Sequence, residues 1–122
     1  MAKGQPDKRR EQRIEQEIVV DANGPEEQAM GWYYYLEDKL HFPFRSTCVA
    51  QRPSSPLRKG QEVEVTDLAP EDECEHEMFV MVNWEKRKLA APLVQLEPIQ
   101  TDKATQEAIK DWHYWVNQGY EF

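Results

Sequence analysis

"PEEQAMGWYYYLEDKLHFPF", residues 25–44, is the stretch whose pattern decides the first part of the fold. Pro25 suits the first turn of a helix, and the residue before Pro43 is disfavoured in the α region, so the two prolines bound a helical segment. Between them, apolar side chains recur on one helix face, at Ala29, Tyr33, Leu36 and Leu40, widened by Met30 and Tyr34. The pattern predicts an amphipathic, aromatic helix over residues 25–40.

Residues 45–98 have the pattern of several short strands. Val49 is expected to begin the first strand, and the alternation in "QEVEVTDL", residues 61–68, predicts a half-exposed one. "MFVMVNW", residues 78–84, is apolar on both faces and predicts a central strand. "LAAPLVQL", residues 89–96, predicts one or two further short strands.

A second helix is predicted after the strands. Thr101 or Asp102 suits its N-cap. Its packed face is expected to comprise Ala104, Ala108, Ile109, Trp112, Trp115 and Val116. The predicted fold class is therefore α+β: a small SH3-like β-barrel, or a curled antiparallel sheet, with an N-terminal aromatic helix and a C-terminal helix.

The charge of this 122-residue chain is distributed unevenly. The formal net charge is −8, yet residues 1–13 carry five Lys or Arg against two acids, a net +3, which leaves −11 on the remainder. An acidic body repels phosphate backbones and anionic lipids, so we expect neither nucleic acid nor membrane as a partner, whereas cations and basic proteins are favoured. We expect residues 1–13 to be a flexible basic arm and residues 14–122 to be a single domain.

The sequence predicts neither a membrane span nor secretion. No stretch approaches the roughly 18 apolar residues of a spanning helix, and charges stand where a signal peptide has its apolar core. The two cysteines, Cys48 and Cys74, are too few for a disulfide scaffold. We therefore expect a cytoplasmic protein with free thiols.

The stretch "TDLAPEDECEHE", residues 66–77, concentrates negative charge between two predicted strands. It contains no Lys or Arg and six carboxylates, those of Asp67, Glu71, Asp72, Glu73, Glu75 and Glu77. Calcium takes six to eight oxygen ligands in a tolerant geometry, which a flexible acidic loop can supply. The stretch is therefore a candidate calcium site; the alternative is a solvated hairpin tip whose charge keeps the protein soluble.

A second acidic point, Glu37–Asp38, lies at the predicted end of the aromatic helix. Carboxylates are unfavourable at the negative end of the helix dipole unless a positive group is near, and either a bound cation or Lys39 supplies one. The EF-hand pattern is absent, since the nearest fragment, Asp21–Gly24, brings its glycine two positions too early. That fragment is interpreted as a turn.

The contiguous motif Gly31–Asp38, followed by Leu40 and by Phe42–Phe44 and Cys48, resembles the signature of the CcbP-like family of small acidic cyanobacterial calcium-binding proteins. The resemblance implies reversible Ca²⁺ binding by surface acids rather than by an EF-hand, with intracellular calcium buffering or calcium signalling as the role. It implies Asp38 as a ligand with Glu37 beside it, and less directly the acids of residues 66–77. The expected mechanism brings the Asp38 end of the helix and the loop after Leu68 together around the ion.

Three other functions use some of the same residues. An acid/base set of Glu37, Asp38 and His41 lacks a pocket, so no enzyme is predicted. A zinc site from Cys48, Cys74 and two histidines, His76 and His41, lacks a second recognisable ligand pair. The main alternative is an SH3-like protein-interaction module that binds basic partners with its acidic surface and with exposed aromatics among Trp32, Tyr35, Trp84 or Trp115.

Overall fold

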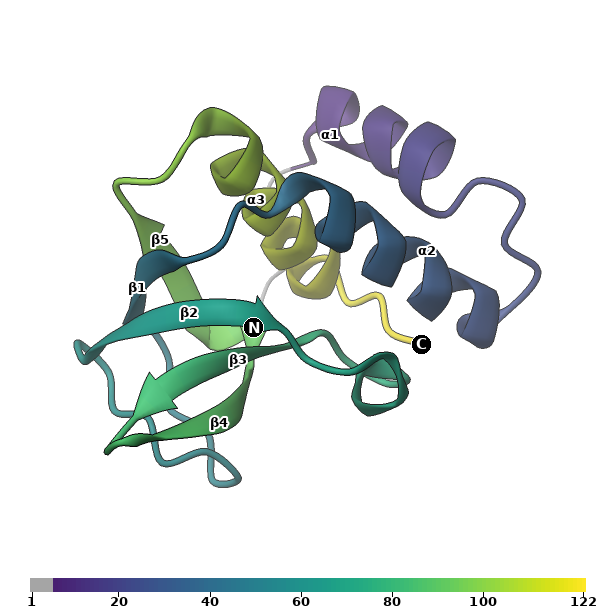
Figure 1. Cartoon of the computed structure of the whole chain (residues 1–122). Coiled ribbons are helices and arrows are strands. Elements are labelled where there is room, and N and C mark those ends of the chain that lie inside the picture. Colours follow the sequence, from purple (N-terminus) through teal and green to yellow (C-terminus); the bar gives the residue numbers. More distant parts are fainter. Residues whose placement is uncertain (1–5) are drawn as a thin grey trace.

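Five antiparallel strands form one sheet in the order β4-β3-β2-β1-β5 (Figure 1). The structure is a computed structural model and describes residues 6–122. The strands are β1 (Phe44–Cys48), β2 (Glu62–Leu68), β3 (Phe79–Trp84), β4 (Arg87–Pro92) and β5 (Leu96–Ile99). The sheet curls but does not close, because β4 and β5 at its edges do not pair with each other. Of the two predicted forms, the curled antiparallel sheet is confirmed.

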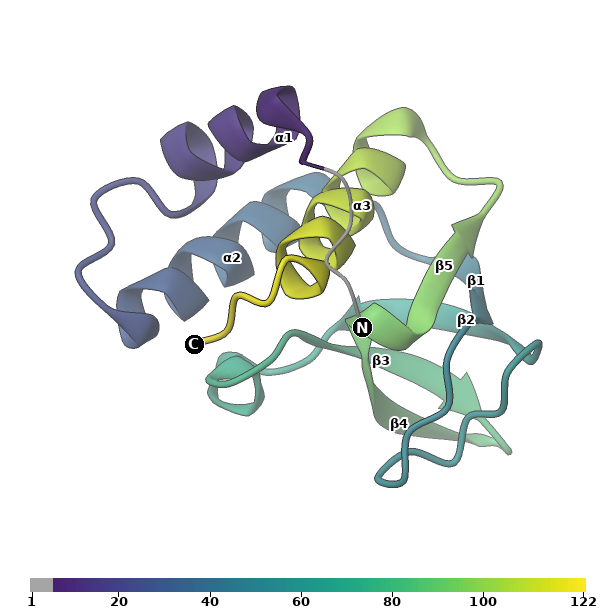
Figure 2. The ribbon, with the colours of Figure 1, turned by 180° about the vertical axis from the view of Figure 1, so that it is seen from behind.

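The helices gather on one side of the molecule and the sheet on the other, as Figures 1 and 2 both show. Helix α1 (Lys8–Arg13) continues into a π-helical turn, η1 (Ile14–Ile18). The other elements are α2 (Pro25–Lys39), the 3₁₀ turns η2 (Glu71–Cys74) and η3 (Leu93–Gln95), and α3 (Lys103–Asn117). None of the helices within residues 6–122 is long and apolar enough to cross a membrane.

Helix α2 matches the predicted helix, and the predicted stripe is buried at Ala29, Tyr33, Leu36 and Leu40. Trp32 is fully buried and its ring contacts that of Trp112, with centroids 5.0 Å apart. Met30 and Tyr34, by contrast, are 43% and 48% exposed. The prediction that they widen the packed stripe is therefore wrong. Local spacing identifies the centre of the packed stripe but not its width, because the width depends on where the other elements lie.

The predictions for β2 and β3 are confirmed. Val63 and Val65 of β2 point into the core, and β3 lies between β2 and β4, as its apolar faces indicate. The expected start of the first strand at Val49 is wrong. β1 begins at Phe44 and pairs with β2 from Phe44↔Val65 onward, because the chain enters the sheet directly after the break that ends α2.

Asp102 caps α3, as predicted, by accepting a hydrogen bond from the Thr105 amide at 2.8 Å. Ala108, Ile109, Trp112 and Trp115 are buried, as expected for the packed face. Two members of the predicted face differ, since Ala104 is exposed and Val116 is only half-buried. Asp111 is fully buried instead. A search for apolar stripes does not find a buried carboxylate.

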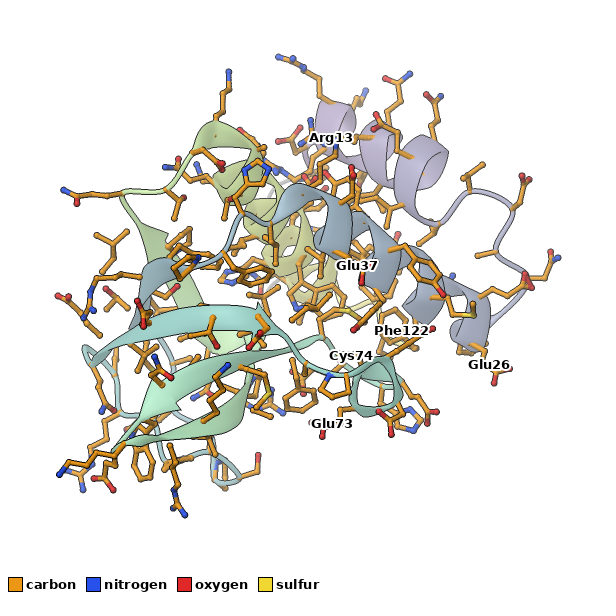
Figure 3. All side chains as sticks on the ribbon, viewed as in Figure 1. Arg13, Glu26, Glu37, Glu73, Cys74 and Phe122 are labelled. Carbon is orange, nitrogen blue, oxygen red and sulfur yellow. The ribbon has the colours of Figure 1, made fainter. Side chains whose placement is uncertain are left out.

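The first helix differs from the flexible arm predicted over residues 1–13. Residues 8–13 form α1, and Arg10 and Arg13 both bind the buried carboxylate of Asp111 on α3; Figure 3 labels Arg13. The two arginines offset the desolvation cost of the buried Asp111 carboxylate. These ion pairs hold α1 against α3. Residues 1–5 lie outside the described residues, and the proposed division at residue 14 stays a prediction.

Candidate metal site

Two consecutive tyrosines connect α2 to residues 69–77, which we call the η2 segment. The Tyr33 hydroxyl is buried and donates a hydrogen bond to the Ala69 carbonyl at 2.7 Å. The exposed Tyr34 hydroxyl donates to the Glu71 carboxylate at 3.2 Å. The acidic segment is thus held against the helix at two points, one of them in the protein interior.

Cys74 anchors the η2 segment from its inner side. The side chain is 2% exposed, and its sulfur accepts a hydrogen bond from the Phe79 amide at 3.4 Å. Burial raises the pKa of this thiol, so it stays neutral at physiological pH. Because Cys74 points inward from the 3₁₀ turn, the acids on either side of it are left in solvent. The predicted acidic loop does join two antiparallel strands, β2 and β3, but part of it forms an ordered 3₁₀ turn.

The carboxylates of α2 and of the η2 segment act on the same pair of tyrosines. Burial first, and then the nearby Cys74, Glu37 and Glu71, raise the pKa of Tyr33. The pKa of Tyr34 is raised mainly by Glu71, with a further contribution from Glu37. Glu37 on α2 and Glu71 of the η2 segment thus both lie near this pair of tyrosines, and Figure 3 labels Glu37 on α2 with Glu73 and Cys74 on the η2 segment. The predicted approach of the helix end to the acidic loop agrees with this geometry.

Three of the predicted ligands already have positive partners. Asp38 is 76% exposed and lies 3.6 Å from the Lys39 ammonium. Asp67 accepts hydrogen bonds from Thr66 and from Lys88, and these partners lower its pKa. Glu77 forms an ion pair with Arg52. A cation that recruits any of these three must first displace or share a bound side chain.

The other predicted ligands are exposed and unpaired by cations. Within residues 6–122 no Lys or Arg forms an ion pair with Glu37, Glu71, Asp72, Glu73 or Glu75. Glu71 alone has a side-chain donor, Tyr34. Two like charges about 8 Å apart in water repel by roughly 0.5 kcal/mol, so this group gains from any cation that enters it.

These side chains fit calcium better than zinc. In the part of the chain that the structure describes, no three His, Cys, Asp or Glu side chains are gathered closely enough to hold a metal ion. Zinc prefers a tight tetrahedral set of thiolates and imidazoles, whereas both thiols, Cys48 and Cys74, are buried away from the exposed acids. Calcium tolerates flexible carboxylates that close around it, which is the donor type present.

Several of these acids border a cleft that their spacing in the sequence does not indicate. A cleft of about 770 Å³ lies between α2 and the η2 segment, bordered by Glu26, Met30, Glu71, Asp72 and Glu75. Glu26 is 45 or more residues away from the η2 acids in sequence, so spacing gives no signal for this arrangement. Asp21–Gly24, by contrast, is the turn that its sequence predicts, with Asp21 at φ 59°.

Comparison with known proteins gives the family. A family described as calcium binding, CcbP, matches residues 12–116. The chain belongs to the CcbP family. The crystal structure of Anabaena CcbP is similar over 100% of both chains, with 46% identity and a TM-score of 0.87. A structure of a calcium-binding protein in its calcium-binding form is similar to the same extent, with 44% identity and a TM-score of 0.87.

Among curated proteins, no significant match to the chain was found. The CcbP match confirms the predicted family and Ca²⁺ as the ion that the family implies. It also agrees with the α+β fold and its curled sheet. The individual ligands named from the sequence stay predictions.

Proposed function

We propose that this protein binds Ca²⁺ reversibly through carboxylates of Glu37 and of the η2 segment, without an EF-hand. One observation carries the proposal: Tyr34 of α2 donates a hydrogen bond to Glu71 at 3.2 Å, which holds the acidic η2 segment beside the helix that carries Glu37. Within residues 6–122 neither Glu37 nor Glu71 forms an ion pair with a Lys or Arg. Membership of a calcium-binding family supports the choice of ion.

The chain's own residues prepare this site in two ways. Tyr33 and Cys74 order the η2 segment beside α2 before the ion binds. Calcium binding therefore costs less conformational entropy than it would for a disordered loop. The exposed carboxylates keep their rotational freedom, and a divalent cation removes their mutual repulsion. A site of this kind, open to solvent and not enclosed, suits exchange with a fluctuating calcium concentration.

The physiological role we propose is calcium buffering or calcium signalling in the cytoplasm, with no catalytic activity. The exposed carboxylates that border the cleft support this role, as does the calcium binding described for the family. The SH3-like alternative is weaker in the form predicted, since Trp32 and Trp115 are 0% and 5% exposed and form no aromatic surface. The acidic surface itself remains available to basic groups.

Isothermal titration calorimetry of chelator-treated protein tests the proposal. Calcium should give a heat signal that saturates and should raise the melting temperature. The protein's affinity for calcium should exceed its affinity for magnesium. The same titration on Asp38→Ala examines the ligand that the family resemblance implies. The calcium affinity of this variant should fall, because Asp38 is expected to exchange its ion pair with Lys39 for the ion. The fold without calcium should stay intact. Absence of any heat or melting change with calcium would contradict the proposal.

A further inference from the structure

The cleft between α2 and the η2 segment is far larger than an ion requires. Its volume of about 770 Å³ is within the roughly 300–1,000 Å³ range of ligand pockets. Calcium sits only 2.3–2.6 Å from its ligands and would occupy a small part of this space. The remaining volume is enough for one large side chain and the chain segments beside it.

Apolar side chains form the inner wall of the cleft. Ala29, Tyr33 and Cys74 are buried at its base, and half-buried Phe122 closes one end. Figure 3 shows Phe122 between α2 and the η2 segment. Met30 borders the cleft with 43% of its surface exposed. Methionine adapts its shape to varied apolar partners, and exposed apolar groups around a concave site mark a place of interaction.

The edge of the cleft is mainly acidic, with His76 as the one histidine among its lining residues. Glu26 stands on the α2 side, and Glu71, Asp72 and Glu75 stand on the η2 side. No Lys or Arg borders the cleft, and in the described part of the chain none forms an ion pair with these four carboxylates. A ligand that enters the apolar base therefore passes four uncompensated negative charges, which select a cationic neighbour.

We propose that this acidic cleft binds a segment of a partner protein in which an apolar side chain is flanked by lysine or arginine, and that calcium releases it. The apolar side chain packs against Met30 and the buried base, and the flanking cations meet the carboxylates at the edge. The release step rests on the proposed function, because Glu71, Asp72 and Glu75 are both cleft edge and candidate calcium ligands. Calcium bound there neutralises the charges that hold the segment.

Fluorescence anisotropy with three short labelled peptides tests the cleft in the presence of a chelator. The first alternates lysine and leucine, the second replaces leucine with serine, and the third replaces lysine with glutamate. The first alone should bind, and raised salt should weaken it. No binding of the first peptide, or equal binding of the serine peptide, would overturn the assignment.

Two variants test whether the peptide binds in the cleft. Met30→Ser should weaken binding about threefold to tenfold through lost apolar contact, and Glu75→Gln about twofold to fivefold. The matched control is Glu97→Gln, an exposed residue of β5 that does not border the cleft. Circular dichroism checks that each variant is folded. An equal loss in the Glu97 variant would show attraction to net charge alone and would overturn the proposal.

Calcium is then added to the peptide complex, with calorimetry of the peptide-free protein in parallel. Calcium should raise the peptide dissociation constant about threefold or more, and magnesium should do so less. Calcium binding without peptide release would overturn the release step. Peptide binding in a protein that shows no calcium heat would leave the cleft assigned and refute the proposed function. A dimer that Met30→Ser dissociates in sedimentation would instead identify a second copy as the occupant and overturn the partner proposal.

Discussion

Arg13 and Asp111 form a bidentate ion pair between the first helix and the last. The Arg13 Nε and Nη2 atoms lie 3.0 Å and 2.8 Å from the two carboxylate oxygens of Asp111. Arg10 binds the same carboxylate at 2.6 Å, and the Tyr35 hydroxyl of α2 donates to it at 2.7 Å. One buried acid thus joins α1, α2 and α3.

Replacing Asp111 by alanine should be among the most destabilising changes in the chain. It leaves two arginines and a tyrosine hydroxyl without their acceptor, and loss of one partner from a buried ion pair costs about 3–5 kcal/mol. Urea denaturation measures the free energy of unfolding. Asp38→Ala is the control, because its 76% exposed side chain should change stability by less than ~0.5 kcal/mol. Similar losses in both variants would contradict a structural role for the Asp111 cluster.

The Asp111 cluster also predicts how stability changes in alkali. Burial, followed by its hydrogen bond to Asp111, raises the pKa of Tyr35 above the ordinary value of 10.0. Above pH ~10 the unfolded chain loses this proton while the folded chain keeps it, so the free energy of unfolding falls as pH rises toward the raised pKa. The contribution of this group is at most ~1.4 kcal/mol per pH unit.

Tyr35→Phe isolates that contribution. The difference in free energy of unfolding between the parent protein and the variant should narrow between about pH 8 and about pH 11. Only the parent has a hydroxyl proton at residue 35 that the unfolded chain loses in alkali. Urea denaturation at both pH values measures the difference, and ultraviolet absorbance follows tyrosinate formation. A difference that stays constant over this range would show that the Tyr35 proton does not contribute to the pH dependence of the free energy of unfolding.

Gly31 is predicted to resist the substitution that usually strengthens a helix. Glycine to alanine in an exposed helix interior stabilises by about 1 kcal/mol. Here a Cβ atom on residue 31 would lie 2.2 Å from the Ile18 carbonyl oxygen, so η1 must move away from α2. Gly31→Ala should therefore destabilise by about 1–3 kcal/mol in thermal or urea unfolding. Since the normal effect has the opposite sign, a stabilised variant would show that the two elements separate freely.

The sequence predicts those elements whose periodicity is local. The helix over α2 and the strands β2 and β3 follow from apolar spacing, and Asp102 follows from cap chemistry. The burial of Asp111 does not, because its partners Arg10 and Arg13 lie 101 and 98 residues away. The width of the inward face of α2 is not predicted either, since Met30 and Tyr34 beside the buried stripe are exposed.

The candidate site divides in the same way. Acid density locates the η2 segment, and the family resemblance connects it to the end of α2. Which acids are already paired is not visible in the sequence, because Lys88 is 21 residues from Asp67 and Arg52 is 25 residues from Glu77. The cleft depends on Glu26 and Phe122 meeting the η2 segment in space, which only the assembled fold provides.

The two tyrosines that hold the η2 segment should differ sharply in importance. Tyr33→Phe removes the donor to the Ala69 carbonyl, and an unsatisfied buried group costs about 1–3 kcal/mol. Tyr34→Phe removes an exposed hydrogen bond to Glu71 and should cost little. Urea denaturation and amide hydrogen exchange over residues 69–78 measure the two effects. Faster exchange is expected only in the Tyr33 variant, so equal exchange would argue against the buried anchor.

Calcium affinity should depend on which acids are free and not on how many there are. Glu37→Gln removes an unpaired carboxylate facing the tyrosine pair and should weaken calcium binding about threefold to tenfold, or ~1 kcal/mol. Asp67→Asn removes the same charge from a residue already bound by Lys88, so its affinity should change less than about twofold. Calorimetry on both variants compares their calcium affinities. Equal losses would mean that calcium responds to net charge alone, and a larger loss for Asp67 would move the site to the β2 end of the acidic stretch.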